Sequence, residues 1–528
     1  MKRVLVANRG EIAVRVIRAC HEEGLDAVAV YSEPDRLAPH VRNADAAVLL
    51  GPAPSGESYL DIKKLIAAAK DTGCQAVHPG YGFLSERAPF AEACLQNGLI
   101  FVGPPASAIR AMGDKTEARR RMQAAGVPVV PGSAAPLRDA VAARFEAKRL
   151  GYPVLLKAVA GGGGKGMRRV AGDAEIENAF HAAKREAQKA FGDGSVYVEK
   201  YLERPRHIEI QVLADHRGRV VALGERECSI QRRHQKLIEE APSAAVSPAL
   251  RRRLSEAATA AAGSVGYVGA GTIEFLLAPS GEFYFLEMNT RIQVEHPVTE
   301  LVYGVDIVRE QLRIAGGQAM RVHGATGPGG QLHPRGHAIE CRITAEDPFN
   351  DFLPATGVLQ YLRVPGGPGI RWDSGVEAGN DVTLFYDPLL AKLIAWGESR
   401  EVAIQRMRRA LSELVIVGLP TSQPFHLRVM DDSAFIKGDI DITYLERVGA
   451  RILAAAPRPG LERALAVAAA LVADEARTAG QPAPSVARGP VGRSAGESDQ
   501  VGPSGRPAVR PSPWVIEGRR LGLRDGLE

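Results

Sequence analysis

The chain has 528 residues, more than one hydrophobic core ordinarily supports, so we expect two to four domains. Its composition, 45% hydrophobic and 24% charged, is typical of a soluble globular protein. The formal net charge of +5 is small for this length and argues against a nucleic-acid-binding protein, in which basic residues would cluster far more heavily.

The first region, residues 1 to about 113, alternates strand-like and helix-like segments. This βαβ rhythm indicates a parallel sheet covered by helices. Its first turn, NRGEIA, matches the GxGxxG pattern poorly, so we do not predict dinucleotide binding. The predicted strands are 4–7, 27–31, 76–78 and 100–102, and the predicted helices are 11–23 and 59–71.

The second region, residues 114 to about 330, opens with a densely charged helix at 115–125 and continues mainly with strands. A third region, residues 331 to about 445, is marked by turns such as PGGPG at 365–369. The whole pattern indicates a multidomain protein of the α/β and α+β classes. The strands predicted in the second region are 154–158, 196–198, 208–212, 272–276 and 283–287.

The last region, residues 446–528, differs in composition. Residues 479–513 contain no Ile, Leu, Phe, Tyr or Trp and are rich in Pro, Gly, Ser and Arg, so they cannot bury enough apolar surface to fold. We predict that this tail is largely a disordered linker and that a chain cut after about residue 446 keeps its activity.

Cysteines and apolar runs give no sign of export or membrane insertion. The five cysteines stand far apart without a CxxC pair, which indicates reduced thiols in the cytoplasm. The N-terminal apolar run is too short for a signal peptide, and the longest apolar stretch, residues 464–473, is too short to span a bilayer. We expect a cytoplasmic protein with neither a membrane nor a nucleic-acid partner.

A strand that runs into a glycine-rich turn is the first candidate phosphate site. Lys157 begins the segment KAVAGGGGKGM, whose glycines let backbone N–H groups approach phosphate oxygens. The segment is not a Walker A loop, because Lys165 is followed by Gly166 instead of Ser or Thr. Lys115, at a helix start, supplies a second lysine. For the glycines alone, a flexible turn is an equally good interpretation.

The segment HIEIQV at 207–212 alternates polar and apolar residues. In a strand, His207, Glu209 and Gln211 share one face and the isoleucines pack on the other. In isolation, an ordinary amphipathic strand with a wet face is the simpler interpretation. His207 and His234 lack the spacing of a paired metal site, so we do not predict them as metal ligands.

The strongest local pattern is FYFLEMNTRIQVEHPVTE at 283–300. Its first four residues are apolar, which predicts a strand buried on both faces. Polar residues then occupy successive odd positions and point one way if the chain stays extended. These residues are Glu287, Asn289, Arg291, Gln293 and Glu295.

This row and Glu274, from the predicted strand GTIEFLL, suggest a metal–phosphate site. Glu274, Glu287 and Asn289 offer only hard oxygen ligands, the kind that Mg²⁺ prefers. Arg291 could grip a small planar anion, and Glu295 beside it could act as a base.

Taken together, residues 1 to about 445 resemble the biotin carboxylase family, the ATP-grasp component of biotin-dependent carboxylases. Several long segments in the right order are far more specific than any single loop. The segments are NRGEIAVRVIRAC, HPGYGFLSE, GDK, KAVAGGGGKGM, VEKYLERPRHIEIQ, ERECSIQRRHQKLIEEAPS, the 283–300 segment, HAIECRITAED and YDPLLAKLI.

The resemblance implies a Rossmann-like N-terminal lobe at 1–113, an ATP-grasp lobe with a glycine-rich lid at 114–330, and a C-terminal lobe at 331–445. It also implies ATP and Mg²⁺ or Mn²⁺, the metal bound by Glu274, Glu287 and Asn289. The residues implied for ATP are Lys115, Lys157, Gly163, Gly164, Glu199, Lys200, Leu202, His207, Gln231, His234, Glu274 and Glu287.

The resemblance further implies that bicarbonate is held and deprotonated before it attacks the γ-phosphate. Arg342 would stabilise the biotin enolate, and Tyr81 would lie near the biotin. None of these positions departs from the family pattern. The residues implied for bicarbonate are Lys236, Arg291, Gln293 and Val294, with Glu295 as the base.

The partners implied are a biotin carboxyl carrier protein, carboxyltransferase subunits and a second copy of the chain, with Arg18 and Glu22 at the dimer contact. None of the eight methionines lies in a Met-Lys-Met tripeptide, so we expect biotin to arrive on another protein. Acetyl-CoA or propionyl-CoA is the expected acceptor, with pyruvate as the alternative. A different ATP-grasp ligase and an inactive ATP-binding scaffold are the competing interpretations.

Overall fold

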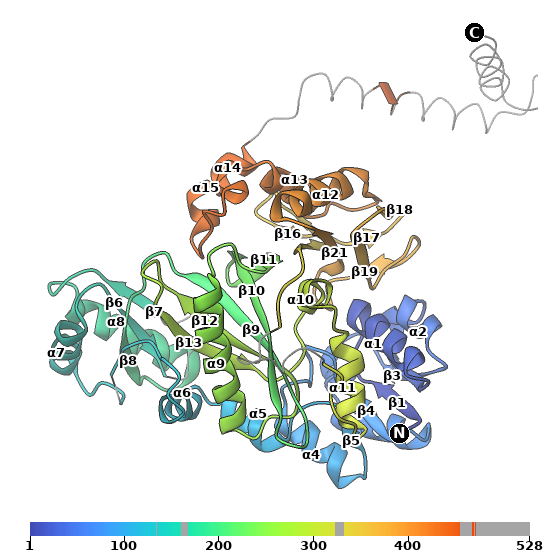
Figure 1. The fold of residues 1–528 in the computed structure, drawn as a ribbon, viewed down its shortest axis with the longest axis horizontal. Helices are drawn as coiled ribbons and strands as arrows, with labels where there is room; N and C mark the ends of the chain where they lie inside the picture. Colours follow the sequence, from blue (N-terminus) through green and yellow to red (C-terminus); the bar gives the residue numbers. More distant parts are fainter. Residues whose placement is uncertain (134, 160–166, 323–331, 455–466, 469, 471–528) are drawn as a thin grey trace, which may run out of the picture. The chain divides into compact units, whose positions relative to one another are not determined.

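The computed structural model describes residues 1–133, 135–159, 167–322, 332–454, 467–468 and 470 (Figure 1). Residues 1–455 form one compact unit, which contains nearly all of the described residues. The glycine run at 161–164 and the predicted linker at 479–513 lie outside the described residues, as does most of the apolar stretch at 464–473.

The N-terminal part of the first unit is a five-stranded parallel sheet in the order β3-β2-β1-β4-β5 (Figure 1). Val4 and Val6 of the central strand pack into one core cluster and Leu5 into another, because helices cover both faces. The predicted parallel, helix-covered sheet is confirmed. The elements are β1 Arg3–Val6, α1 Gly10–Glu22, β2 Asp26–Ser32, α2 Pro39–Asn43, β3 Ala46–Gly51, α3 Ile62–Asp71, β4 Ala76–His78, α4 Ala88–Gln96, β5 Ile100–Phe101 and α5 Ala106–Gly113.

The second sheet has eight strands in the order β13-β12-β9-β10-β11-β14-β21-β19, all antiparallel to their neighbours. Strand β11 pairs with β14, so residues on both sides of the predicted boundary at 330 share this sheet. The strands are β9 Arg206–Ala214, β10 Val220–Arg232, β11 Gln235–Ala241, β12 Gly269–Leu277, β13 Phe283–Asn289, β14 His337–Thr344, β19 Ile370–Ser374 and β21 Leu389–Gly397.

Strand β13 is the edge of the eight-stranded sheet, and the prediction that it is buried on both faces is wrong. Phe283 and Phe285 pack into a core cluster together with α5 and α6 (Lys115–Ala124). Leu286, on the opposite face, is 39% exposed. An apolar run of four residues therefore does not show by itself whether both faces of a strand are covered.

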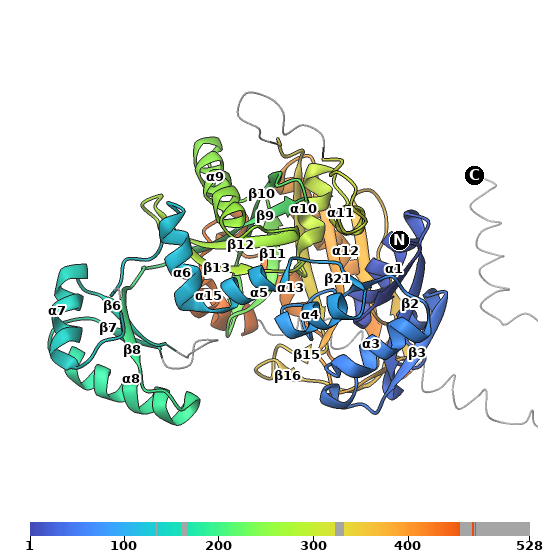
Figure 2. The same cartoon turned by 90° about the horizontal axis from the view of Figure 1, so that it is seen from below.

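A smaller three-stranded sheet, β7-β6-β8, follows α6 in the chain. Helices α7 (Ala140–Leu150) and α8 (Ile176–Phe191) contact each other and cover one of its faces (Figure 2). Leu156 packs under these helices, so the alternation along the strand turns Lys157 to the uncovered face. The strands are β6 Val154–Ala158, β7 Met167–Val170 and β8 Val196–Lys200.

Helices from the C-terminal part pack against the far end of the eight-stranded sheet (Figure 1). The remaining elements are α9 Pro248–Ser264, α10 His296–Tyr303, α11 Ile307–Ala315, β15 Glu346–Asp347, β16 Leu353–Pro354, β17 Gly357–Val358, β18 Tyr361–Arg363, β20 Asp381–Val382, α12 Arg400–Glu413, β22 Val415–Val417, α13 Gln423–Met430, α14 Ser433–Ile436 and α15 Tyr444–Leu453.

Helix α15 belongs to the folded core, so a chain cut after about residue 446 is expected to be less stable than the sequence suggested. Tyr444, Val448 and Ile452 are buried in the same core cluster as β14 and β21. A chain cut after residue 446 loses the last two of these side chains, whose burial contributes about 1.5–3 kcal/mol each. We therefore expect that chain to have a lower Tm and reduced yield.

The matching control is a chain cut after residue 454, which keeps α15 whole. It is expected to retain the Tm of the full chain and nearly its full rate of carboxylation with free biotin. Both quantities are measured by thermal unfolding and by fixation of labelled bicarbonate. If the chain cut after residue 454 folds but is inactive, residues 455–528 take part in catalysis.

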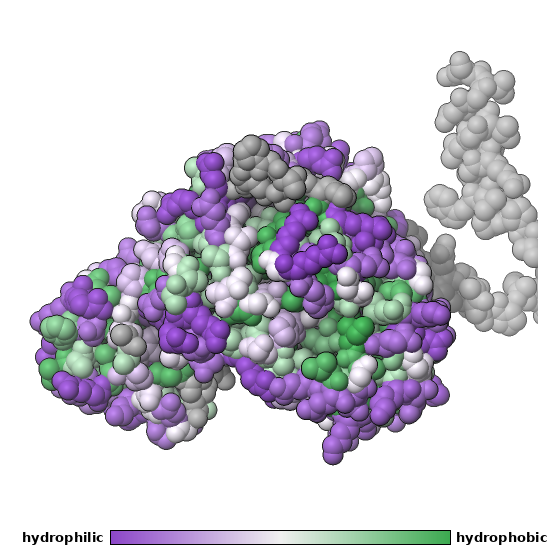
Figure 3. All heavy atoms as spheres, turned by 60° about the horizontal axis from the view of Figure 1, so that its bottom comes forward, coloured by the Kyte–Doolittle hydropathy of each residue, from purple (hydrophilic) through white to green (hydrophobic). Residues whose placement is uncertain are grey.

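Among the residues that the structure describes, no helix is long and apolar enough to cross a membrane. On the face shown in Figure 3, hydrophilic residues alternate with small groups of apolar ones.

Candidate active site

Charged side chains line one face of the eight-stranded sheet, where neighbouring strands bring them into register. Glu209 on β9 lies opposite Glu274 on β12 and opposite Arg226 on β10. Farther along the sheet, Glu239 on β11 lies opposite Glu340 on β14. All five side chains are buried, so an ionised group here needs a partner of opposite charge. Glu340, whose carboxyl oxygens have no hydrogen-bond partner among the described residues, has a pKa that burial raises well above its usual value.

Glu295 stands above this face at the beginning of α10. The chain leaves the extended conformation after Asn289, where β13 ends, so the expected row of alternating side chains does not continue. Glu295 nevertheless lies over the sheet, because α10 packs against β10, β11 and β14. The turn into the helix, and not strand alternation, brings this carboxylate to the site.

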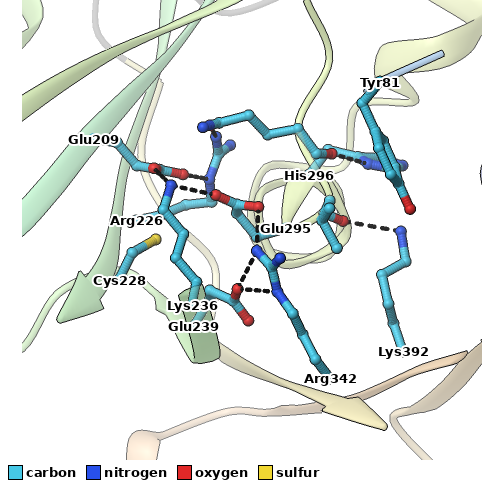
Figure 4. A network of polar contacts seen from close by, with 12 residues as sticks. Tyr81, Glu209, Arg226, Cys228, Lys236, Glu239, Glu295, His296, Arg342 and Lys392 are labelled. Atoms are coloured by element: carbon cyan, nitrogen blue, oxygen red, sulfur yellow. Dashed lines mark hydrogen bonds and ion pairs between the residues drawn. The ribbon is translucent and has the colours of Figure 1, made fainter. Parts of the chain in front are cut away.

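The Glu295 carboxylate bridges two cations from different strands (Figure 4). Its Oε1 accepts a hydrogen bond of 2.7 Å from Lys236 Nζ, and its Oε2 accepts one of 2.8 Å from Arg342. Burial alone would raise the pKa of Glu295, but Lys236, Arg342 and Arg226 lower it well below its usual value. The carboxylate is therefore ionised throughout the neutral pH range.

Lys236 joins three carboxylates at one point. Its Nζ donates to Glu209 at 2.6 Å, to Glu274 at 2.8 Å and to Glu295 at 2.7 Å. Burial alone would lower the pKa of Lys236, but the three negative charges raise it well above its usual value. The lysine is thus a fixed positive charge that faces a cluster of acceptors.

Arg342 is held by two carboxylates. It donates to Glu239 through Nε at 2.6 Å and to Glu295 at 2.8 Å. Burial raises the pKa of Glu239 to about 7, with Arg342 acting to lower it and Glu295 acting to raise it further. The guanidinium is therefore fixed in place between an ionised carboxylate and one that titrates near neutral pH.

Arg226 is fully buried beneath the site and was not predicted from the sequence. It donates to Glu209, to Gln211 at 2.8 Å and to Gln293 at 2.8 Å. Gln293 in turn donates to Glu274 at 2.8 Å. The arginine fixes side chains that contact Lys236 and Glu274. Its chain position, in the segment ERECSIQRRHQK, gives no sign of this role because its partners are distant in sequence.

The three predicted metal ligands come from two paired strands. Glu274 and Glu287 are opposite each other in the β12–β13 register, and Asn289 Nδ2 donates to Glu274 Oε1 at 2.9 Å. His207 Nε2 also lies 3.0 Å from Glu274 Oε2. The oxygen-rich set fits Mg²⁺ or Mn²⁺. His207, Glu209 and Glu274 form a further group whose ligand atoms lie within 4.8 Å of one another.

Four of the residues predicted for the nucleotide, Lys157, Glu199, Gln231 and His234, lie on the small sheet or at the tip of the β10–β11 hairpin. Lys157 Nζ contacts Glu199 at 2.6 Å, on the face of the small sheet that α7 and α8 leave open. Gln231 lies 3.0 Å from His207 Nδ1, whereas His234 is exposed in the hairpin turn. Gly163 and Gly164 lie outside the described residues.

The other predicted nucleotide residues have simpler surroundings. Lys200 Nζ donates to the carbonyl of Gly151 at 2.7 Å, so its side chain points away from Lys157. Leu202 is half-buried in the turn between β8 and β9. Lys115 is the first residue of α6, whose N-terminus is capped by the Asp114 side chain.

The remaining anion and biotin residues surround the Glu295 cluster. Arg291 donates to Glu86 at 2.8 Å and to Asn289 at 2.9 Å. It lies four residues before Glu295 in the chain. Val294 is half-buried immediately before Glu295. Tyr81, from the N-terminal part, donates its hydroxyl to Glu11. The structure thus brings residues from four distant segments to one place.

Three family models match the chain, each over one part of it. The biotin carboxylase N-terminal domain matches residues 1–109, and the biotin carboxylase C-terminal domain matches residues 340–447. Between them, the ATP-binding domain of the carbamoyl-phosphate synthase L chain matches residues 114–323.

Curated and solved relatives agree with these models. The biotin carboxylase of Nostoc sp. is 53% identical over 446 residues, 84% of this chain and 99% of the relative. A pyruvate carboxylase subunit of Methanothermobacter thermautotrophicus is 52% identical over 84% of this chain and 89% of its own. The biotin carboxylase domain dimer of Hydrogenobacter thermophilus 2-oxoglutarate carboxylase, solved with MgADP, ADP and bicarbonate, is 47% identical with a TM-score of 0.79, covering 86% of this chain and 99% of that one.

Proposed function

Because the chain belongs to the biotin carboxylase family and is an ATP-dependent carboxylating ligase, we propose that it carboxylates biotin on a separate carrier protein as one component of an acyl-CoA carboxylase. The observation that carries this proposal is the Glu295 carboxylate held between Lys236 and Arg342. In this proposal Glu295 is the base, Lys236 is the cation for bicarbonate and Arg342 is the cation for biotin.

The first half-reaction consumes bicarbonate and ATP. Lys236, Arg291, Gln293 and Val294 hold bicarbonate, a poor nucleophile that must be deprotonated and oriented. Its proton passes to a Glu295 oxygen as a bicarbonate oxygen forms the bond to the γ-phosphorus. The bond from that phosphorus to the ADP oxygen breaks, which leaves carboxyphosphate and ADP.

We assign ATP and its metal ion to the residues that the sequence predicted for them. Lys115 and Lys157 contact ATP phosphates, with Gly163 and Gly164 in the lid. Glu199, Lys200, Leu202, His207, Gln231 and His234 surround the rest of the nucleotide. Glu274, Glu287 and Asn289 hold Mg²⁺ or Mn²⁺, which supplies positive charge to the phosphates when bound. Support comes from the hard oxygen donors of this set and from the relative solved with MgADP.

The second half-reaction transfers the carboxyl group to biotin. Carboxyphosphate breaks into CO₂ and phosphate, the phosphate takes the ureido N–H proton of biotin, and the nitrogen of the resulting enolate then forms the bond to CO₂. Arg342 stabilises the negative charge that develops on the enolate oxygen, and Tyr81 lies beside the ring. Support comes from Glu239, which holds the guanidinium next to Glu295.

A biotin carboxyl carrier protein and carboxyltransferase subunits complete the cycle. Acetyl-CoA or propionyl-CoA is our first choice for the acceptor and pyruvate the second. The carboxyltransferase chooses the acceptor, which explains why relatives named for pyruvate and 2-oxoglutarate both match this chain at about half identity. The biotin carboxylase lobe is common to all of them.

We also propose a homodimer that uses the outer face of α1. Arg18 and Glu22 line an open hollow of about 470 Å³, together with Arg371 and Trp372. The Hydrogenobacter relative is described as a dimer. Sedimentation of the Arg18→Glu variant is expected to show a smaller species than the wild type.

Bicarbonate-dependent ATP cleavage that free biotin accelerates is the expected activity of the purified chain. Labelled bicarbonate is expected to appear in carboxybiotin only when ATP and Mg²⁺ are present. A chain that cleaves ATP without bicarbonate, or transfers phosphate to an amino acid, would be a different ligase. Carriers that co-purify from the native cells are detected with streptavidin, and their fractions are then assayed with acetyl-CoA, propionyl-CoA and pyruvate.

A further inference from the structure

Two of the segments that resemble the family meet in a buried ion pair for which the proposed mechanism has no use. Glu11 comes from NRGEIA on α1, and Lys392 comes from YDPLLAKLI on β21. Lys392 is fully buried and Glu11 is 4% exposed. The Lys392 Nζ lies 3.0 Å from Glu11 Oε2, although the two residues are 381 positions apart, the difference between 392 and 11.

Each partner of this ion pair also contacts a residue of the site. Lys392 Nζ donates a hydrogen bond of 2.9 Å to the carbonyl oxygen of Val294, and Tyr81 donates its hydroxyl to Glu11 Oε1. In Figure 4, Lys392 and Tyr81 lie together on the side of Glu295 away from Lys236, with the Tyr81 hydroxyl turned toward the Lys392 ammonium. Asp373 lies farther away, 3.9 Å from Nζ.

We propose that Glu11 and Lys392 are positioning residues, which hold the Val294–Glu295 peptide and the Tyr81 hydroxyl in one fixed arrangement. The proposal rests on the assignment of Val294 and Glu295 to bicarbonate and of Tyr81 to biotin. Neither Glu11 nor Lys392 touches a substrate in this scheme. Their role is to set the relative positions of the two substrates.

Geometry explains how a bond to Val294 acts on the base. A peptide unit is planar, so the carbonyl oxygen of Val294 and the backbone nitrogen of Glu295 move together. Lys392 therefore fixes the backbone from which the Glu295 side chain leaves. A shift of about 1 Å in a reacting group costs about 100-fold in rate, so such an anchor has a measurable effect.

The energetic cost of the pair also favours a positioning role. Burying two charges is expensive, and apolar residues of similar volume often serve stability equally well or better. Burial raises the pKa of Glu11, while Lys392 and the Tyr81 hydroxyl act to lower it. A stabilising core alone does not require such a pair at the junction of α1, β21 and the Glu295 turn.

The test replaces the pair as a unit, because removal of Glu11 alone would leave Lys392 buried without its nearest carboxylate. The variant Glu11→Gln/Lys392→Met is expected to fold and to bind ATP with its KM unchanged. Its KM for bicarbonate and its KM for biotin are each expected to rise about tenfold or more, with a lower kcat. Thermal unfolding and steady-state kinetics of the full chain give these quantities.

A matched control removes another buried ion pair of the same sheet. Arg251 donates two hydrogen bonds of 2.6 Å to Glu225, which is fully buried. Glu225 precedes Arg226 on β10, so its side chain points away from the site. The variant Glu225→Gln/Arg251→Met is expected to change the Tm but to leave the KM for bicarbonate and biotin near the wild-type values.

A second variant serves if the first does not fold. Lys392→Met alone removes the bond to Val294, and Glu11, whose pKa burial already raises, loses the cation that lowers it and becomes neutral. A rise in the KM for bicarbonate is expected at an unchanged KM for ATP. If the folded variants have wild-type KM values, or if the control shifts them equally, the inference is wrong. Wild-type protein without bicarbonate-dependent ATP cleavage would instead overturn the proposed function, and the inference with it.

Discussion

Replacing Glu295 by Gln is expected to lower biotin carboxylation by about two to four orders of magnitude, the usual effect of losing a general base. Gln keeps the shape of the side chain and one acceptor oxygen, but it cannot take the proton of bicarbonate. Lys236 and Arg342 each lose an ionised partner at 2.7 and 2.8 Å. Both remain paired, Lys236 with Glu209 and Arg342 with Glu239, so the fold is expected to persist.

The informative control lies one turn farther along the same helix. Glu300 is also buried and also bridges two cations, Arg15 at 2.9 Å and Arg371 at 2.7 Å. Glu300→Gln therefore removes a comparable charge without touching the proposed bicarbonate site. We expect Glu295→Gln to bind ATP normally and to be inactive, and Glu300→Gln to lose stability while it remains active. Retained turnover in Glu295→Gln would remove this residue from the role of base.

The general fold could be predicted because the spacing of apolar residues in the sequence indicates strands and helices. The strand predicted at 76–78 matches β4, and that at 154–158 matches β6. Strand β3 was missed because it lies at the edge of its sheet and buries only Leu50 fully. Strands β14 and β21 were missed because they pair with segments far away in the chain, which a local pattern cannot show.

Some residues of the site could also be predicted from the sequence, but not from periodic patterns alone. The polar row at 287–295 already suggested Glu295 as a base, and the resemblance implied the same role. Strand alternation predicted the wrong path to it, because the chain turns into α10 after β13. Four buried charged residues of the site were given no role from the sequence, because the contacts of each are with a partner on another strand or helix. They are Arg226, Glu239, Glu11 and Lys392. Charge pairing across a sheet is a property of the fold, and sequence spacing does not contain it.

The two cations that flank Glu295 are expected to differ in which half-reaction they support. Arg342→Ala should reduce biotin carboxylation by about 100-fold or more while bicarbonate-dependent ATP cleavage falls far less, since the enolate forms only in the second step. Lys236→Ala should reduce both activities by about 100- to 1,000-fold, because bicarbonate is consumed in the first step. The ratio of ATP cleaved to biotin carboxylated measures the difference.

Both variants remove a buried charge, so stability must be followed together with rate. Without Lys236, Glu209 keeps Arg226, Glu295 keeps Arg342, and Glu274 keeps His207 at 3.0 Å. Without Arg342, the Glu239 carboxyl, whose pKa of about 7 already reflects its burial, loses the cation that lowers it and becomes neutral at neutral pH. Each site can thus relax without a free charge, and the variants are expected to fold. If both variants lose the two activities equally, the assignment of Lys236 to bicarbonate and Arg342 to biotin is wrong. Lys236, Glu295 and Arg342 then act as a single unit.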